Sequence, residues 1–181
     1  MPRILAPLAL CLFALIAVAP NAKAASAHEI DVGVDETLDR FFHRIGGARD
    51  LARKAVGILV FPSVVKAGLG FGGEYGEGAL LIRGETVDYY NTLSASVGFQ
   101  LGVQERSVII AFMTQEALEQ FRRTAGWKVG VDGSVAIITL GLGGSIDTNK
   151  ITSPVVGFIL DPKGLMYNLT LEGSKISRIS R

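Results

Sequence analysis

The stretch that decides the fold is residues 56–78, VGILVFPSVVKAGLGFGGEYGEG, in which six of the last eleven residues are glycine. Five of these glycines fall on even positions: Gly68, Gly70, Gly72, Gly76 and Gly78. Because successive side chains of a strand point to opposite faces, one face of a strand here would be almost bare backbone. Glycine weakens a strand unless something must approach it closely. The pattern therefore predicts a strand whose bare face packs against a helix or a ligand such as an acyl chain.

Further segments of strand character follow in the remaining sequence. Residues 79–83 and 86–90 flank a predicted turn at Gly84-Glu85, and apolar residues alternate with small ones over 93–103. Later segments cover residues 107–113, 133–143, 153–160, 165–171 and 174–179. Together they predict an α+β fold with a strongly curved or barrel-like, mainly antiparallel sheet of about eight or nine strands.

Two segments have helical spacing instead. Over residues 35–55 apolar residues recur every three or four positions, with Gly46-Gly47 interrupting the run, which predicts an N-terminal amphipathic helix with a basic second face. The basic face allows two interpretations: an ordinary surface helix, or contact with anionic lipid headgroups. Residues 114–125 predict one short mid-chain helix that ends before Gly126.

The amino terminus has the pattern of a secretory signal peptide. Arg3 precedes an apolar segment, and Ala22-Lys23-Ala24 offers small residues for cleavage. The apolar segment of roughly 16 residues is shorter than the ~20 needed to span a bilayer. We therefore expect residues 1–24 to be a signal peptide, with cleavage after Ala24 or, alternatively, Ala27. Residues 25–34 are expected to be a flexible leader, followed by a single domain over 35–181.

Composition excludes several classes of function. Removal of residues 1–24 leaves 16 basic and 17 acidic residues and no cysteine, so bulk attraction to nucleic acid and thiol chemistry are both excluded. The glycines do not open a helix, which argues against nucleotide binding. Glu74 and Glu77 form a carboxylate pair that is either part of a solvated acidic region or the site of an acid-based hydrolase. The leading expectation is a protein that is not an enzyme and needs no cofactor or metal.

Several blocks together resemble the SYLF-domain family. They are KAVGILVFPSVVKAGLGFGGEYGEGALL over residues 54–81, YY and SxSxG within 89–98, Gly126-Trp127, GSIDT at 144–148 and GLM at 164–166. The resemblance spans roughly residues 35–180. It implies lipid binding, since eukaryotic members bind phosphoinositides and bacterial members with signal peptides are usually described as lipid-binding periplasmic or envelope proteins. Some eukaryotic members also bind actin, which an exported bacterial protein would not meet.

In eukaryotic members the phospholipid contact is attributed to a basic amphipathic helix at the start of the domain, which matches residues 35–55 here. We therefore expect an exported, periplasmic or membrane-peripheral protein that contacts anionic phospholipid headgroups. The candidate lipid-binding residues are Arg44, Arg49, Arg53, Lys54 and Lys66. The alternative is a structural envelope module that binds a protein partner through an exposed strand edge or the helix.

Overall fold

The computed structural model describes residues 24–139, 144–164, 171 and 173–181. Its helices are α2 (Ala27–Arg44), α3 (Ala48–Lys54) and α4 (Gln115–Arg123), with a short 3-10 turn at Thr148–Lys150. Its strands are β1 (Gly57–Ile82), β2 (Glu85–Phe112), β3 (Trp127–Lys128), β4 (Ala136–Thr139), β5 (Val155–Gly164) and β6 (Lys175–Ile179). The α+β class and the mainly antiparallel sheet are confirmed, although β4 pairs with β5 in parallel. The predicted signal peptide and most of the predicted strand 165–171 lie outside the described residues.

β1 and β2 form one very long antiparallel hairpin. Their pairing runs from Gly57 opposite Phe112 to Ile82 opposite Glu85. The two residues between the strands, Arg83 and Gly84, both have positive φ, at 57° and 84°. Such a two-residue turn follows the right-handed twist of the strands it joins. The turn therefore lies one residue before the predicted Gly84-Glu85.

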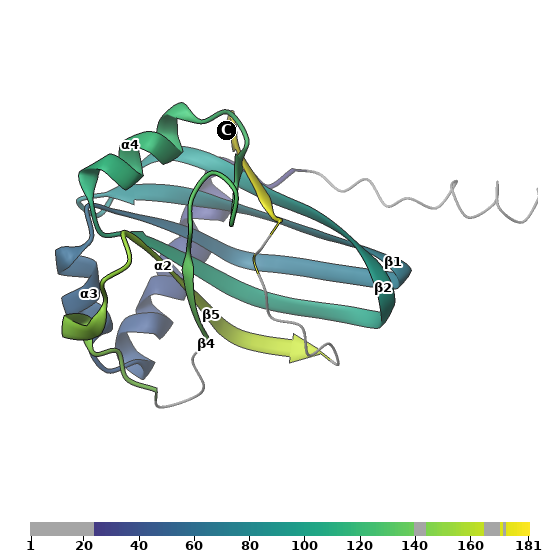
Figure 1. The fold of residues 1–181 in the computed structure, drawn as a ribbon, viewed down its shortest axis with the longest axis horizontal. Coiled ribbons are helices and arrows are strands. Elements are labelled where there is room, and N and C mark those ends of the chain that lie inside the picture. Colours follow the sequence, from purple (N-terminus) through teal and green to yellow (C-terminus); the bar gives the residue numbers. More distant parts are fainter. Residues whose placement is uncertain (1–23, 140–143, 165–170, 172) are drawn as a thin grey trace, which may run out of the picture.

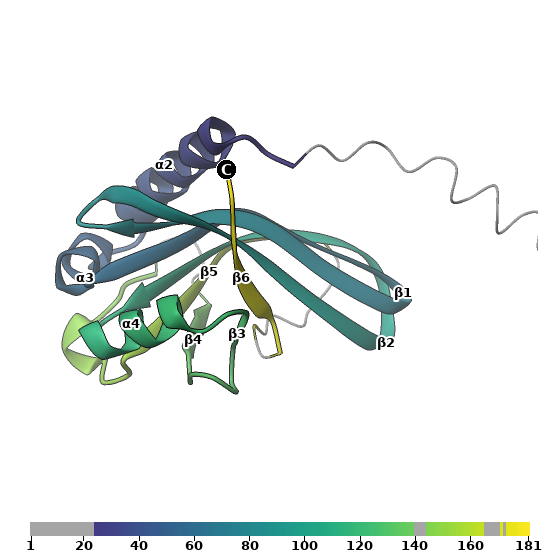
Figure 2. The same ribbon diagram turned by 90° about the horizontal axis from the view of Figure 1, so that it is seen from above.

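The hairpin bends back on itself, which gives the sheet its strong curvature. In Figures 1 and 2 both strands run to one end of the molecule, bend there and return. The register shifts at this bend, between Leu69 and Phe71 of β1. Segments predicted as separate strands are therefore continuous within β1 and β2, and the described residues give six strands. The predicted curved sheet is confirmed.

The bare glycine face packs against the first half of β1 itself. A Cβ added at Gly78 would lie 2.0 Å from the carbonyl oxygen of Val60, and one at Gly76 would lie 2.7 Å from that of Ser63. No real Cβ tolerates such distances to backbone, so only glycine lets the two halves of the strand approach this closely. At these positions the close neighbour is therefore the same strand, and not the helix or ligand that the sequence left open.

Two apolar layers cover the two faces of the sheet (Figure 2). On one face α2, through residues such as Val34 and Phe41, and α3, through Leu51, pack in one cluster with Val60 and Phe158. On the other face Phe121 of α4 joins a second cluster that includes Phe112, Tyr90 and Trp127.

α2 begins eight residues earlier than the sequence predicted. Ser26 forms a capping box with Glu29, in which each side chain accepts a hydrogen bond from the other residue's backbone N–H. The two satisfied donors fix the helix start, and Ile30 and Val34 are buried. The expectation of a flexible leader over 25–34 is therefore wrong from Ala27 onwards. Gly46 and Gly47 divide α2 from α3, as the interruption in the pattern predicted. Of the helices in the described ranges, none has the length and apolar character to cross a membrane.

Candidate functional site

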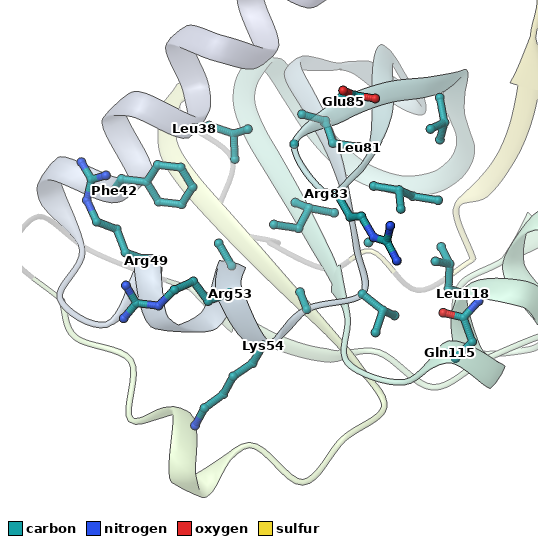
Figure 3. A pocket seen from close by; sticks show the side chains of 18 of the residues that line it. Leu38, Phe42, Arg49, Arg53, Lys54, Leu81, Arg83, Glu85, Gln115 and Leu118 are labelled. Carbon is teal, nitrogen blue, oxygen red and sulfur yellow. The ribbon is translucent and has the colours of Figure 1, made fainter.

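A wide groove of about 1500 Å³ opens between α2 and α3, the β1–β2 turn and α4 (Figure 3). Its position follows from the fold, because the hairpin turn at Arg83-Gly84 projects between the two helical regions. Apolar side chains from every one of these elements line the groove: Leu38, Phe42, Ala52, Ala55, Val56, Ile58, Leu81, Ile82, Val87 and Leu118. A groove lined in this way can accept hydrocarbon.

Charged side chains also line this groove. Five are basic: Arg49, Arg53, Lys54, Arg83 and Arg122. Four are acidic: Asp35, Asp39, Glu85 and Glu119. Cations beside an apolar surface provide the two kinds of contact that an anionic amphiphile needs, one for its phosphate and one for its chains.

Three of the five predicted site residues lie at this groove, all on α3. The Arg49 guanidinium carbon lies 5.3 Å from the centroid of the Phe42 ring, a cation–π distance. Arg53 pairs with Asp50 one turn earlier on the same helix, and 76% of its side chain is exposed. Lys54 Nζ donates to Thr148 Oγ1 at 3.0 Å. These contacts with other side chains are at the exposed surface, where ion pairs contribute little and exchange readily with other partners.

The other two predicted residues lie elsewhere. Arg44 Nη1 pairs with Asp161 Oδ1 at 3.2 Å, and Arg44 does not line the groove. Lys66 is only 6% exposed, because it lies on the even-numbered face of β1 that the bend of the hairpin encloses. The structure therefore does not bring Arg44 and Lys66 to the site that holds Arg49, Arg53 and Lys54.

Arg83 was missed by the sequence analysis. It occupies the first position of the hairpin turn, and it lines the groove between α3 and α4 (Figure 3). Arg83 makes no ion pair with any residue in the described ranges. The sequence showed it only as a residue beside a turn, and its nearness to α3 depends on how the hairpin packs.

A buried ion pair lies inside the bent hairpin. Arg106 Nη2 donates to Glu74 Oε2 at 2.7 Å, and both side chains are almost fully buried. Burial raises the pKa of the Glu74 carboxyl, and the charges of Arg106 and Lys66 oppose this shift. The raised pKa shows that desolvation outweighs the attraction of the two cations.

The pair Glu74 and Glu77 does not form a hydrolase site. Glu77 has the opposite parity and binds on the other side of β1, where it accepts hydrogen bonds from Ala25 N, Tyr75 Oη and Arg181. The two carboxylates therefore point to opposite faces of one strand and do not converge in a cleft. The hypothesis of a hydrolase based on these two residues is wrong.

Comparison with protein families gives a match over the second half of the chain. The family described as "Ysc84: Las17-binding protein actin regulator" matches residues 93–180, which extend from the middle of β2 to the end of β6. A comparison with curated proteins found no match. The family match indicates a binding module of the lipid- or actin-related kind. It covers α4, whose residues form one wall of the groove, and it stops short of α2 and α3.

Proposed function

We propose that this chain, which belongs to the SYLF-domain family, is an exported protein that binds anionic phospholipid in the groove beside α3. The observation that carries the proposal is the juxtaposition in one groove of a large apolar lining with cations from separate elements. α3 supplies Arg49, Arg53 and Lys54, and the hairpin turn supplies Arg83. In Figure 3 the α3 cations lie on one side of the groove and Arg83 lies on the other, beside Gln115 and Leu118, so both sides of the groove offer donors to an anionic headgroup.

The apolar lining supports the second half of the proposal. Leu38 and Phe42 come from α2, while Leu81 and Ile82 come from the end of β1. Phe42 and Ile82 are half-buried, so their remaining surface is available to an acyl chain. Covering apolar surface contributes about 25 cal/mol per Å², which makes the chains a source of affinity as well as the headgroup. Arg44 and Lys66 have no part in the proposed contact, since the first pairs with Asp161 and the second is buried.

The test is retention of the processed protein, beginning at Ala25, on sedimented vesicles. We expect retention on vesicles of phosphatidylglycerol and phosphatidylcholine, and little on phosphatidylcholine alone. The double variant Arg53→Glu/Lys54→Glu should bind at least about 30-fold more weakly, because loss of each cation near an anionic surface costs a factor of about 5 and the new carboxylates are repelled as well. The matched control is Arg123→Glu/Lys163→Glu, which makes the same charge change at two exposed residues outside the groove.

Two outcomes would contradict the groove proposal. Equal retention on neutral vesicles would show that the cations do not contribute to lipid binding. An equal loss of binding in the control variant would show that net charge matters and the groove does not. A lipid monomer provides a second measurement: dihexanoyl phosphatidylglycerol below its micellar concentration should shift amide signals of α3 and the β1–β2 turn.

Export is the second part of the proposal and rests on the amino-terminal pattern. Cleavage after Ala24 would leave Ala25 as the first residue, and Ala25 N already lies 3.1 Å from Glu77 Oε2. The new ammonium group would then gain a carboxylate partner. Mass spectrometry of the protein from the periplasmic fraction should find a chain that begins at Ala25, and retention of the whole protein in the cytoplasmic fraction would contradict export.

A protein partner in the envelope remains the alternative function. It would be favoured if the purified native protein carried no extractable lipid and eluted with a stoichiometric partner. The same purification followed by lipid extraction and mass spectrometry therefore separates the two functions.

A further inference from the structure

A second apolar surface lies at the bent end of the β1–β2 hairpin, at the opposite end of the molecule from α3 and α4 (Figure 1). Phe71 is 78% exposed, Val103 62% and Leu93 55%. Val65 and Tyr75, from the same face of the hairpin, are exposed as well. Large apolar side chains that gather on one exposed surface mark a place of contact with another molecule or a membrane.

The exposed apolar face of the hairpin continues along β1 into a part that α2 covers. Further along β1, Ala79 and Leu81 have the same parity as Phe71 and Tyr75, and they are buried beneath α2. α2 begins at Ala27, and Ala25 lies beside Glu77. Within the part of the chain that the structure describes, no helix covers β1 beyond this point. The apolar outer face of the hairpin thus extends past its own helix.

The bent end also lacks charge. Residues 67–73 of β1 and 93–103 of β2 contain no Asp, Glu, Lys, Arg or His. Residues 67–69 pair with 101–103, and residues 71–73 pair with 95–97, so the backbone groups that these pairs share are satisfied within the ribbon. Charge and unpaired backbone are the two features that make contact with hydrocarbon costly, and the ribbon limits both.

Cations border this surface on one side. Tyr75 is paired with Leu93, Leu93 with Lys175, and Lys175 with Lys128. Directly paired residues of neighbouring strands project to the same face. All four side chains are exposed, so one row across β1, β2, β6 and β3 passes from aromatic to aliphatic to basic. An anionic bilayer has the matching order, with hydrocarbon below and phosphates above it.

We propose that the bent end of the hairpin inserts this apolar face into the surface of an anionic bilayer, with Lys128 and Lys175 at the level of the headgroups. Tyr75 suits the boundary between the two regions, because its ring is apolar and its hydroxyl donates to Glu77. The row of paired lysines selects the bilayer over a second copy of the chain, since a two-fold contact through this face would bring like charges together. This inference does not depend on the groove.

A tryptophan at position 71 reports insertion directly. In Phe71→Trp the new indole replaces the most exposed large apolar side chain that the structure describes in the hairpin. The native Trp127 is buried and supplies a constant background. With vesicles of phosphatidylglycerol and phosphatidylcholine, we expect its emission to move to shorter wavelength and to be quenched by lipids brominated on the acyl chains. Unchanged emission from protein that sediments with these vesicles would overturn the inference.

Variants then separate the hairpin end from the groove. In the Arg53→Glu/Lys54→Glu background, which removes the groove contact, Lys128→Gln/Lys175→Gln should weaken the remaining vesicle binding about 30-fold, from two cations at a factor of about 5 each. In the same background Arg123→Gln/Lys150→Gln, at two exposed cations, should leave it within twofold. Val103→Ser should also reduce binding, whereas Val32→Ser, at an exposed valine of α2, should not. Amide shifts on α3 caused by dihexanoyl phosphatidylglycerol monomers should persist in Lys128→Gln/Lys175→Gln, so failure of the groove proposal remains visible separately.

A second copy of the chain is the competing occupant. Sedimentation equilibrium of the wild type should give a monomer in the absence of lipid. A dimer that Val103→Ser dissociates, together with vesicle binding that Val103→Ser does not alter, would overturn the inference and assign the surface to self-association.

Discussion

Substitution of Gly78 tests the reason for the glycine-rich pattern in β1. A Cβ at this position would lie 2.0 Å from the carbonyl oxygen of Val60, and real Cβ atoms essentially never come within 3.0 Å of a neighbour. Gly78→Ala must therefore separate the two halves of β1 by at least 1 Å. Overpacking of this kind costs 1–3 kcal/mol where side chains can move, and here the obstacle is backbone. We expect a loss of about 3 kcal/mol in the free energy of unfolding, or about 6–12 °C in Tm for a domain of this size.

Two other glycines of the same strand make the test quantitative. Gly76→Ala meets the Ser63 carbonyl oxygen at 2.7 Å, so the backbone must yield by only 0.3 Å and the loss should be intermediate. Gly73→Ala meets nothing closer than 3.8 Å and should be neutral or stabilise by about 0.4–1 kcal/mol, because alanine restricts the unfolded chain. Urea denaturation followed by the fluorescence of Trp127, the single tryptophan, measures all three.

The order of the three variants in free energy of unfolding tests whether close packing explains the glycines. The close packing of β1 against itself requires that Gly73→Ala is the most stable variant and Gly78→Ala the least. Equal losses at positions 73 and 78 would show that the distance to the facing backbone does not set the cost, and the explanation of the bend would be wrong.

Two further predictions concern the interior ion pair and the start of α2. Arg106→Met should destabilise the protein by about 3–5 kcal/mol near neutral pH, because it leaves the Glu74 carboxylate buried without its Arg106 partner. The loss should be smaller near pH 4, where Glu74 is protonated. Arg123→Met is the control at an exposed arginine. The pKa of Glu74 is raised in the folded state, so the protonated carboxyl stabilises the fold below its usual pKa of 4.5, and this stabilisation is lost as the pH rises through the folded pKa. Glu74→Gln, which cannot ionise, should therefore gain stability relative to wild type as the pH rises through the folded pKa. Ser26→Ala should cost about 1 kcal/mol by removing the cap of α2, and Ser134→Ala, at an exposed loop serine, should cost almost nothing; an equal effect would mean that the helix does not begin at Ala27.

Strand periodicity predicted the fold class because it depends on local order alone. The parity of the glycines identified a bare face, and that face exists. What approaches it could not be predicted, because parity does not reveal that Gly78 meets Val60 of the same strand. The same parity places Lys66 on the enclosed face, so its burial was implicit in the pattern that defined the strand.

The sequence also contained the signal for the start of α2. Ser26 followed by Glu29 has the spacing of a capping box, but the small and polar residues around it gave the impression of a mobile segment. The groove is different, since it joins α3 to a hairpin turn and to α4. Basic residues on α3 were recognisable as candidates, whereas Arg83 became one only when the hairpin placed it opposite them.

The bend in β1 links the two proposed contacts with lipid. Close packing at Gly76 and Gly78 makes the strand double back, which places the bend of the hairpin at one end of the molecule and α3 and α4, beside the groove, at the other. A bilayer that receives Phe71 therefore lies far from the groove, and the groove would remain open to solvent or to a second membrane. The glycines thus affect function because they set the distance between the two surfaces. Gly78→Ala should impair both contacts together, while Lys128→Gln/Lys175→Gln should impair only the contact at the bent end of the hairpin. Loss of groove binding in Lys128→Gln/Lys175→Gln would show that the two surfaces are one site, which is incompatible with their separation by the length of the hairpin.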